Sequence, residues 1–271
     1  MSKAKRNTVL IVMFVLLVLL GIGIAVTIPN SVRHESIQVM MRDAVLHDEN
    51  KIEIFGGLLV DPSLVSGFIV TGLLLFFALL IRIFAIPRFK YVPGRFQLVI
   101  EEWVSIFDNL AKGNSPHKYN TLGAYIFAAG SYIFVGTMFE LFGFQAVNTA
   151  GHSVSLPAPL ANINGAISMG VFSYLFIMFG GIMANGIKGV GKTLKEFSLP
   201  ISMSFRLFGA LLSGMLTTEL VYYYTHLSFV LPVAVGILFT VLHALIQAYV
   251  LTMLTSVYYG EVSEKETAGI S

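Results

Sequence analysis

The sequence predicts an all-α, polytopic membrane protein, and three observations lead to this fold class. Hydrophobic residues make up 56% of the 271 residues and charged residues only 12%, about half the share expected of a soluble domain. Six apolar stretches reach roughly the 20 residues that a helix needs to cross a bilayer. Basic residues gather in alternate connecting segments, as they do in helical membrane proteins.

The same composition excludes several classes of protein. So few charges cannot cover the surface of a soluble enzyme, a nucleic-acid-binding protein or a disordered chain of this length. The chain has no Cys, which excludes a disulfide framework, a Cys-ligated metal site and a thiol nucleophile. We also expect no other bound metal or cofactor.

The first apolar stretch, residues 8–28, follows Lys3, Lys5 and Arg6. It exceeds the usual apolar run of about 7–15 residues in a signal peptide, and no clear small-residue cleavage site follows it. We expect a retained signal-anchor helix, with a cleaved signal peptide as the alternative. A polar segment comes next, so residues 1–61 form an anchor and an external segment.

The second span is expected at Leu64–Phe84, with a basic group around its end. Residues 96–112 place apolar side chains at helical spacing, with acidic residues between them. This pattern predicts an amphipathic helix that lies at the membrane surface or continues into the membrane.

Four more spans follow, and the last two are long. Residues 145–164 between the third and fourth spans contain no Lys or Arg, whereas a short basic loop follows the fourth span. Residues 62–262 form the predicted core, and residues 263–271 form a polar tail. The four spans are expected at Leu122–Phe144, Ala166–Ile187, Leu199–Tyr224 and Phe229–Tyr259.

Six spans place both termini on one side of the membrane, and the basic residues indicate which side. Only Arg33, Arg42 and Lys51 fall in segments on the opposite side. The positive-inside rule therefore predicts cytoplasmic termini. The 13 residues in the predicted cytoplasmic segments are Lys3, Lys5, Arg6, Arg82, Arg88, Lys90, Arg95, Lys112, Lys118, Lys188, Lys192, Lys195 and Lys265.

The remaining basic residue, Arg206, lies about seven residues inside the fifth span. A charge at that depth costs several kcal/mol, so it marks a candidate functional site. One interpretation is a side chain that extends back to the cytoplasmic interface. The other is a permanent positive charge that faces a protein partner.

Four other polar residues fall inside the spans or near their ends. Glu140 and Glu219 lie toward the outer side, either as interfacial carboxylates or as part of an ion path. His243 and Gln247 are four residues apart and share a helix face, close to Thr240. They either form interhelical hydrogen bonds or line a polar path between the last two helices.

Residues Gly186–Thr193 match the phosphate-binding pattern G-x-x-x-x-G-K-T. A genuine phosphate-binding loop follows a β-strand and needs an acidic Mg²⁺ partner nearby. Here a membrane span precedes the match, so we interpret it as coincidental. Its glycines are typical of a flexible turn, and its lysines follow the positive-inside rule.

Four segments of the chain resemble subunit a of the F-type ATP synthases, the ion-translocating stator subunit of the Fo sector. The resemblance covers about residues 62–262, and the last two segments are highly specific to that family. The segments are Val92–Gln97 (VPGRFQ), Gly189–Phe197, Pro200–Gly209 (PISMSFRLFG) and Ala244–Thr255 (ALIQAYVLTMLT).

The resemblance assigns roles to individual residues. Arg206 matches the family's essential arginine, Gln247 the glutamine opposite it, and Ser202 a polar position one turn earlier. Glu140 falls near an acidic position of the outer access path.

This chain departs from the family pattern at three positions. Ala210 stands where the family usually has Asn, Met215 where it has Glu, and Thr240 where it often has His or Glu. Glu219 lies one turn after Met215, and His243 lies nearly one turn after Thr240. Either Glu219 and His243 take over the roles of the displaced family residues, or the outer channel is built differently.

The resemblance implies a non-catalytic subunit in the cell membrane that couples ion flow to the rotation of a ring of c subunits. It also implies a subunit b peripheral stalk, the rest of the F1Fo complex and membrane lipid as partners, and no nucleic acid. Protons are the expected ion, with Na⁺ left open. The alternative is a free-standing channel or secondary transporter that uses Arg206 to bind an anion.

Overall fold

The computed structural model describes residues 51–54, 57–147, 151, 153–223 and 231–264, with short stretches before them at 11–15, 18–19, 22, 36, 38–39 and 42. Within the helices, the side chains of residues 219, 222, 231 and 232 are not described. The expected first span, residues 8–28, lies largely outside the described residues.

The other five expected spans are confirmed as helices of membrane-crossing length and composition. Their boundaries differ from the predicted ones by a few residues at each end, which is the usual uncertainty of a sequence pattern. The five spans are Pro62–Arg88, Tyr119–Phe142, Ile163–Asn185, Ser198–Thr218 and Val233–Ser263.

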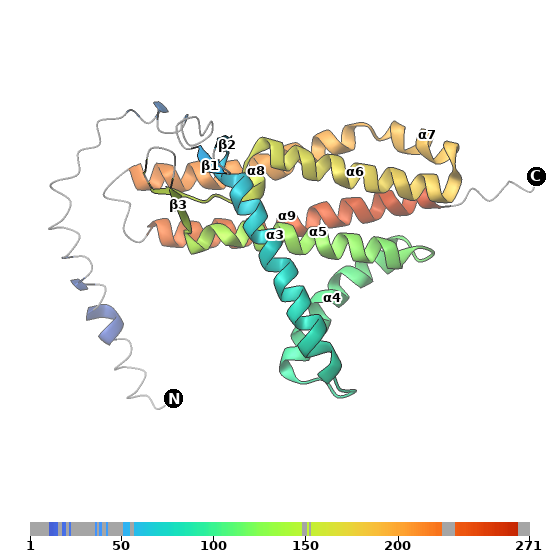
Figure 1. Ribbon diagram of the computed structural model, residues 1–271, viewed down its shortest axis with the longest axis horizontal. Helices are drawn as coiled ribbons and strands as arrows, with labels where there is room; N and C mark the ends of the chain where they lie inside the picture. Colours follow the sequence, from blue (N-terminus) through green and yellow to red (C-terminus); the bar gives the residue numbers. More distant parts are fainter. Residues whose placement is uncertain are drawn as a thin grey trace, which may run out of the picture.

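Four helices lie side by side as a bundle: α5 (Tyr119–Phe139), α6 (Ile163–Asn185), α8 (Ser198–Tyr223) and α9 (Leu231–Ser263). Helix α5 packs on α9, and α6 packs on both α8 and α9 (Figure 1). At 1.5 Å per residue, the 33 residues of α9 extend about 50 Å, well beyond the ~30 Å thickness of the hydrocarbon core. Helix α9 must therefore tilt strongly if it stays in the membrane.

Helix α3 (Pro62–Leu80) runs diagonally across this bundle (Figure 1). It continues through a π-helical turn, η2 (Ile81–Ala85), and a 3-10 turn, η3 (Ile86–Arg88). Only its first half contacts the bundle closely, through Ser63, Ser66 and Val70, which are buried. Most of the apolar side chains in its second half are exposed to the surroundings.

Helix α4 (Arg95–Asn114) confirms the predicted amphipathic helix and packs on α5 and α9. Phe107 and Ala111 are buried on its inner face. On the polar face, the Lys112 ammonium forms an ion pair with the Asp108 carboxylate one turn earlier, with 2.6 Å between nitrogen and oxygen. The hydrogen bond and the charge of Asp108 raise the pKa of Lys112.

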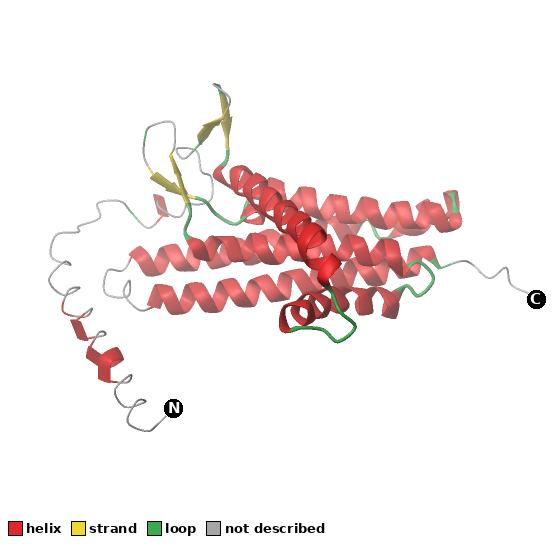
Figure 2. Ribbon diagram, turned by 60° about the horizontal axis from the view of Figure 1, so that its bottom comes forward, coloured by secondary structure: helices red, strands yellow, loops and turns green. Residues whose placement is uncertain are grey.

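Two short β-hairpins, which the sequence pattern did not predict, lie at one end of the bundle (Figure 2). The first pairs β1 (Ile52–Ile54) with β2 (Leu58–Val60), and the second pairs β3 (Gln145–Val147) with β4 (Ser153–Ser155). A 3-10 turn, η5 (Pro159–Ala161), follows the second hairpin. We call this the hairpin end of the bundle.

The opposite end carries α7 (Ile187–Lys195) and is called the α7 end (Figure 1). The expectation of a flexible turn here is wrong, because only Gly186 adopts a left-handed φ of 59° and the residues after it form a helix. The match to the phosphate-binding pattern therefore lies in a helix rather than in a loop. Inside the α6–α7 hairpin, the buried Thr193 hydroxyl donates to the Gly189 carbonyl at 3.0 Å.

Glycine at position 189 lets α7 approach α6 closely. A β-carbon there would overlap the carbonyl group of Gly181, whereas a β-carbon at Gly191, in the same helix, would meet no atom within 4 Å. We expect Gly189→Ala to destabilise the protein by about 1–3 kcal/mol, the usual cost of overpacking. Thermal unfolding of the detergent-solubilised protein measures this.

The matched control for this prediction is Gly191→Ala. It replaces Gly by the better helix former at an open position and is expected to leave stability unchanged or to raise it by up to ~1 kcal/mol. Equal unfolding temperatures for the two variants would contradict the close α6–α7 contact.

Candidate functional site

Helix α8 has one buried face and one exposed face. Leu199, Met203, Leu207 and Leu211 follow one another at helical spacing and are each at most 5% exposed. They pack toward α6 and the core of the bundle. Several residues between them are exposed, so α8 presents a second face that no described element covers. The exposed residues on it include Ser198, Ser202, Phe205, Arg206, Gly209 and Ser213.

A close contact with α6 sets the rotation of α8 about its own axis. A β-carbon at Gly170 of α6 would overlap the Ser204 hydroxyl oxygen and lie 2.9 Å from the Pro200 carbonyl oxygen. The Ser204 hydroxyl, itself buried, donates to that carbonyl at 2.6 Å. Because Gly170 has no side chain, the two backbones approach closely here, as small residues allow in membrane helix pairs.

Arg206 lies on the exposed face of α8, one turn after Ser202. It is the one charged residue in Ser198–Thr218, and no carboxylate among the described residues pairs with it. A guanidinium in this position, without an internal counter-charge, is suited to meet an anion brought by another molecule.

Gln247 of α9 is buried, with 5% of its surface exposed. No hydrogen bond joins its carboxamide to another group among the described residues. Helices α8 and α9 pack together, and Gly214 of α8 faces His243, with the His243 Nδ1 3.7 Å from where a β-carbon would stand. Since the two helices run in opposite directions, Gln247 is level with Ala210, which is offset from Arg206 by one helical turn, or ~6 Å along the helix axis.

The other predicted residues lie nearer the hairpin end and do not form one cluster. His243 is half-buried and packs on the Phe239 ring, with 5.7 Å between ring centroids. Thr240 is half-buried one turn earlier. Glu140 is half-buried and opens η4 (Glu140–Phe142), which contacts α9. Glu219 belongs to α8, and its side chain lies outside the described residues.

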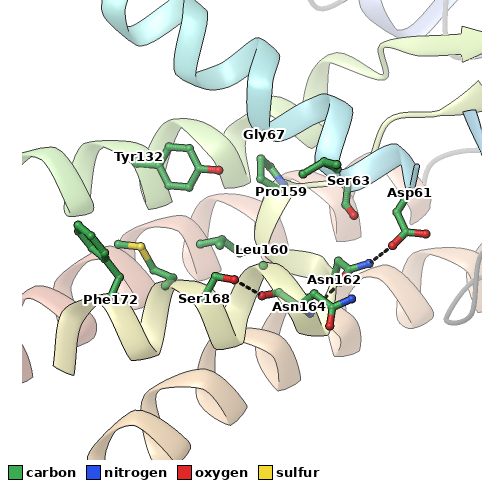
Figure 3. A pocket seen from close by; sticks show the side chains of 13 residues that line it. Asp61, Ser63, Gly67, Tyr132, Pro159, Leu160, Asn162, Asn164, Ser168 and Phe172 are labelled. Atoms are coloured by element: carbon green, nitrogen blue, oxygen red, sulfur yellow. Dashed lines mark hydrogen bonds between the residues drawn. The ribbon is translucent and has the colours of Figure 1, made fainter. Parts of the chain in front are cut away.

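A pocket of about 490 Å³ opens at the hairpin end, between α3, α5 and α6 (Figure 3). At its rim, the Asn162 side-chain amide donates to the Asp61 carboxylate at 3.1 Å, which ties the start of α3 to the start of α6. Asn162 also caps α6 by accepting a hydrogen bond from the backbone N–H of Asn164 at 2.8 Å.

The sequence analysis did not single out Asp61 or Asn162. An Asn directly before an apolar helical run is a helix-start signal, so its capping role was open to prediction. Its contact with a residue 101 positions earlier was not. None of the predicted site residues whose side chains are described lines this pocket.

Comparison with known proteins identifies the family. The family model described as ATP synthase A chain matches residues 64–260. The ATP synthase subunit a of Histophilus somni, from strains 129Pt and 2336, is 29% identical over 206 residues, which cover 62% of this chain and 76% of each relative. The chain belongs to the ATP synthase A chain family.

As a member of the ATP synthase A chain family, the protein is a multi-pass membrane subunit of the Fo sector, which couples proton translocation to rotation. Membership also implies that it acts within an F1Fo complex. Family membership favours the ATP synthase subunit over the free-standing channel or transporter, the other function that the sequence left open.

The α6–α8 contact generates a test of how Arg206 is positioned. Gly170→Ala forces α8 away from α6, so we expect a loss of about 1–3 kcal/mol in stability from overpacking together with a marked drop in proton pumping by the assembled complex. Gly72→Ala, at an open position of α3, is the control and should change neither. Normal pumping by Gly170→Ala would show that the α6–α8 distance does not control the site.

Proposed function

We propose that Arg206 is the fixed cation past which a ring of carboxylate-bearing subunits turns in an F-type ATP synthase. The observation that carries this proposal is a single charge, without a described counter-ion, on the uncovered face of a membrane helix whose other face is buried. On this reading the c-ring covers the exposed face of α8.

The chemistry follows from the environment of the ring carboxyl. Burial in hydrocarbon keeps such a group protonated, whereas a nearby guanidinium favours its ionised form. The proton is therefore released as the carboxyl reaches Arg206, and a new proton loads after it has passed. The positive charge of Arg206 also blocks protons from crossing directly between the two half-channels.

Gln247 and Ser202 serve the same step on either side of Arg206. The Gln247 carboxamide, which has no described hydrogen-bond partner, offers a donor and an acceptor to the passing carboxyl about one turn from Arg206. Ser202 shares the exposed face of α8 and offers a hydroxyl on the cytoplasmic side.

Glu140, Glu219, His243 and Thr240 line the outer half-channel in this proposal. Their support is their common place on the hairpin side of Arg206, on α8, on α9 and at the end of α5. His243 lies about one helical turn nearer to Gln247 than the level at which Glu219 is expected on α8. The histidine is therefore suited to pass protons inward, from Glu219 toward Gln247.

The proposed setting is the cell membrane, with both termini in the cytoplasm and protons as the coupling ion. The c-ring and the subunit b peripheral stalk are the direct partners. Each charge that crosses a potential of 100 mV releases about 2.3 kcal/mol, so several protons must cross for each ATP made elsewhere in the complex.

Replacing Arg206 tests the proposal. In the reconstituted complex, Arg206→Ala is expected to abolish ATP-driven proton pumping and to open a passive proton leak through Fo, because the fixed charge is gone. Arg206→Lys keeps the charge but loses the planar fork of donors and should pump far less than the unchanged complex. Quenching of a pH-sensitive dye in vesicles measures both processes.

Arg82→Ala is the matched control for Arg206, since it removes an exposed arginine from another membrane-spanning helix. It should pump normally. Survival of ATP-driven pumping in Arg206→Ala would sink the proposed role of this residue.

A second variant tests Gln247. Gln247→Leu keeps the volume of the side chain but removes both hydrogen-bonding groups. Losing one hydrogen bond of about 1.4 kcal/mol in the rate-limiting state slows turnover roughly tenfold, so we expect pumping to fall by that factor while the complex still assembles. An unchanged pumping rate would show that Gln247 only packs against its neighbours.

A further inference from the structure

A second concave site lies far along the chain from Arg206, where α3 ends and α4 begins. The connection folds back on itself and encloses a cleft of about 940 Å³, within the range of roughly 300–1,000 Å³ typical of ligand sites. Most of its lining is apolar: Phe77, Leu80 and Phe84 come from the α3 side, and Val92 and Phe96 from the other.

The connecting loop is held in place from within, so the cleft is formed in advance. The buried Gln97 side chain accepts a hydrogen bond from the Lys90 N–H at 3.0 Å and donates to the Lys90 carbonyl at 2.9 Å. Its amide also donates to the Glu101 carboxylate at 2.7 Å. One side chain thus closes the loop between the helices, which gives the glutamine of the VPGRFQ segment a structural role.

The charged residues that line the cleft are both basic. Arg88 and Lys90 both line it and are exposed, and neither pairs with a carboxylate among the described residues. The lining therefore joins a long apolar surface to a rim with two positive charges. This is the complement of a molecule with a hydrocarbon chain and an anionic head.

We infer that this cleft binds one anionic phospholipid, with an acyl chain along Phe77, Phe84 and Phe96 and the phosphate between Arg88 and Lys90. The distribution of Lys and Arg predicts that this end of α3 faces the cytoplasm, so the lipid belongs to the cytoplasmic leaflet. Basic residues at that surface attract anionic headgroups. The site is separate from the ion path and does not depend on its chemistry.

The test uses the assembled complex in phosphatidylcholine vesicles that contain a small share of phosphatidylglycerol with a photoreactive acyl chain. After illumination, mass spectrometry of the peptides that cover residues 77–97 measures labelling. Each basic residue is expected to contribute about fivefold to the affinity for an anionic lipid. Arg88→Gln and Lys90→Gln should therefore each lower labelling roughly fivefold, and the double variant roughly 25-fold. Ala85→Phe, which narrows the apolar part without changing charge, should lower it too.

Arg82→Gln is the matched control, because Arg82 is an exposed arginine of the same segment that does not line the cleft. It should label like the unchanged chain. Equal labelling by photoreactive phosphatidylcholine, or undiminished labelling of the Arg88→Gln/Lys90→Gln variant, would overturn the inference. So would labelling of the isolated full chain that disappears in the assembled complex, since a polypeptide would then occupy the cleft.

Discussion

The close contact between α6 and α8 is the interaction on which the rest of the structure depends. In a bilayer, apolar side chains gain little by leaving lipid for one another, so helices associate through close packing of small residues. Gly170 supplies that closeness, and Ser204 fills it while bonding its hydroxyl to Pro200 within α8. With Leu207 and Leu211 consequently turned inward, the helical repeat leaves Arg206 on the outer face. The position of the charge is thus a result of packing elsewhere on the same helix.

The charge of Arg206 stands out because many other polar groups of the membrane helices form hydrogen bonds within their own helix. Hydrocarbon offers no hydrogen bonds, so a hydroxyl on a membrane helix needs a partner within the protein. Many hydroxyls here use the carbonyl four residues earlier on their own helix, a bond that Ser and Thr readily form. These hydroxyls have already used their one donor within the helix, whereas Arg206 and Gln247 have N–H donors that no hydrogen bond among the described residues uses. The hydroxyls of this kind in the membrane helices are those of Ser66, Thr71, Thr137, Ser168, Ser173, Ser204, Thr217, Thr218 and Thr252.

Periodicity and apolar length were enough to predict five membrane helices and the amphipathic α4, because both properties are local in the sequence. The α7 helix was missed because its glycines signal a turn, and the contact of Gly189 with Gly181 of α6, which explains why position 189 is Gly, is not visible in the sequence. The same limit holds at the site. Arg206 stands out from sequence as a charge within an apolar run, whereas the level of Gln247 relative to it depends on how α8 and α9 pair. The Asp61–Asn162 bond and the loop-closing role of Gln97 likewise join residues whose pairing no local pattern encodes.

Helix α4 links the lipid cleft to the helix that carries Gln247. Its first turn holds Gln97, which closes the cleft. At its last residue, the Asn114 side-chain amide donates to the Ser256 hydroxyl of α9 at 3.2 Å. His117, three residues further on, contacts the Ser263 carbonyl oxygen at 3.0 Å. A 20-residue helix is a rod about 30 Å long, so the occupied cleft and the C-terminal half of α9 share one rigid support. A lipid that stabilises the α3–α4 connection would therefore also stabilise α9, and with it Gln247, without contacting the proposed path of the proton.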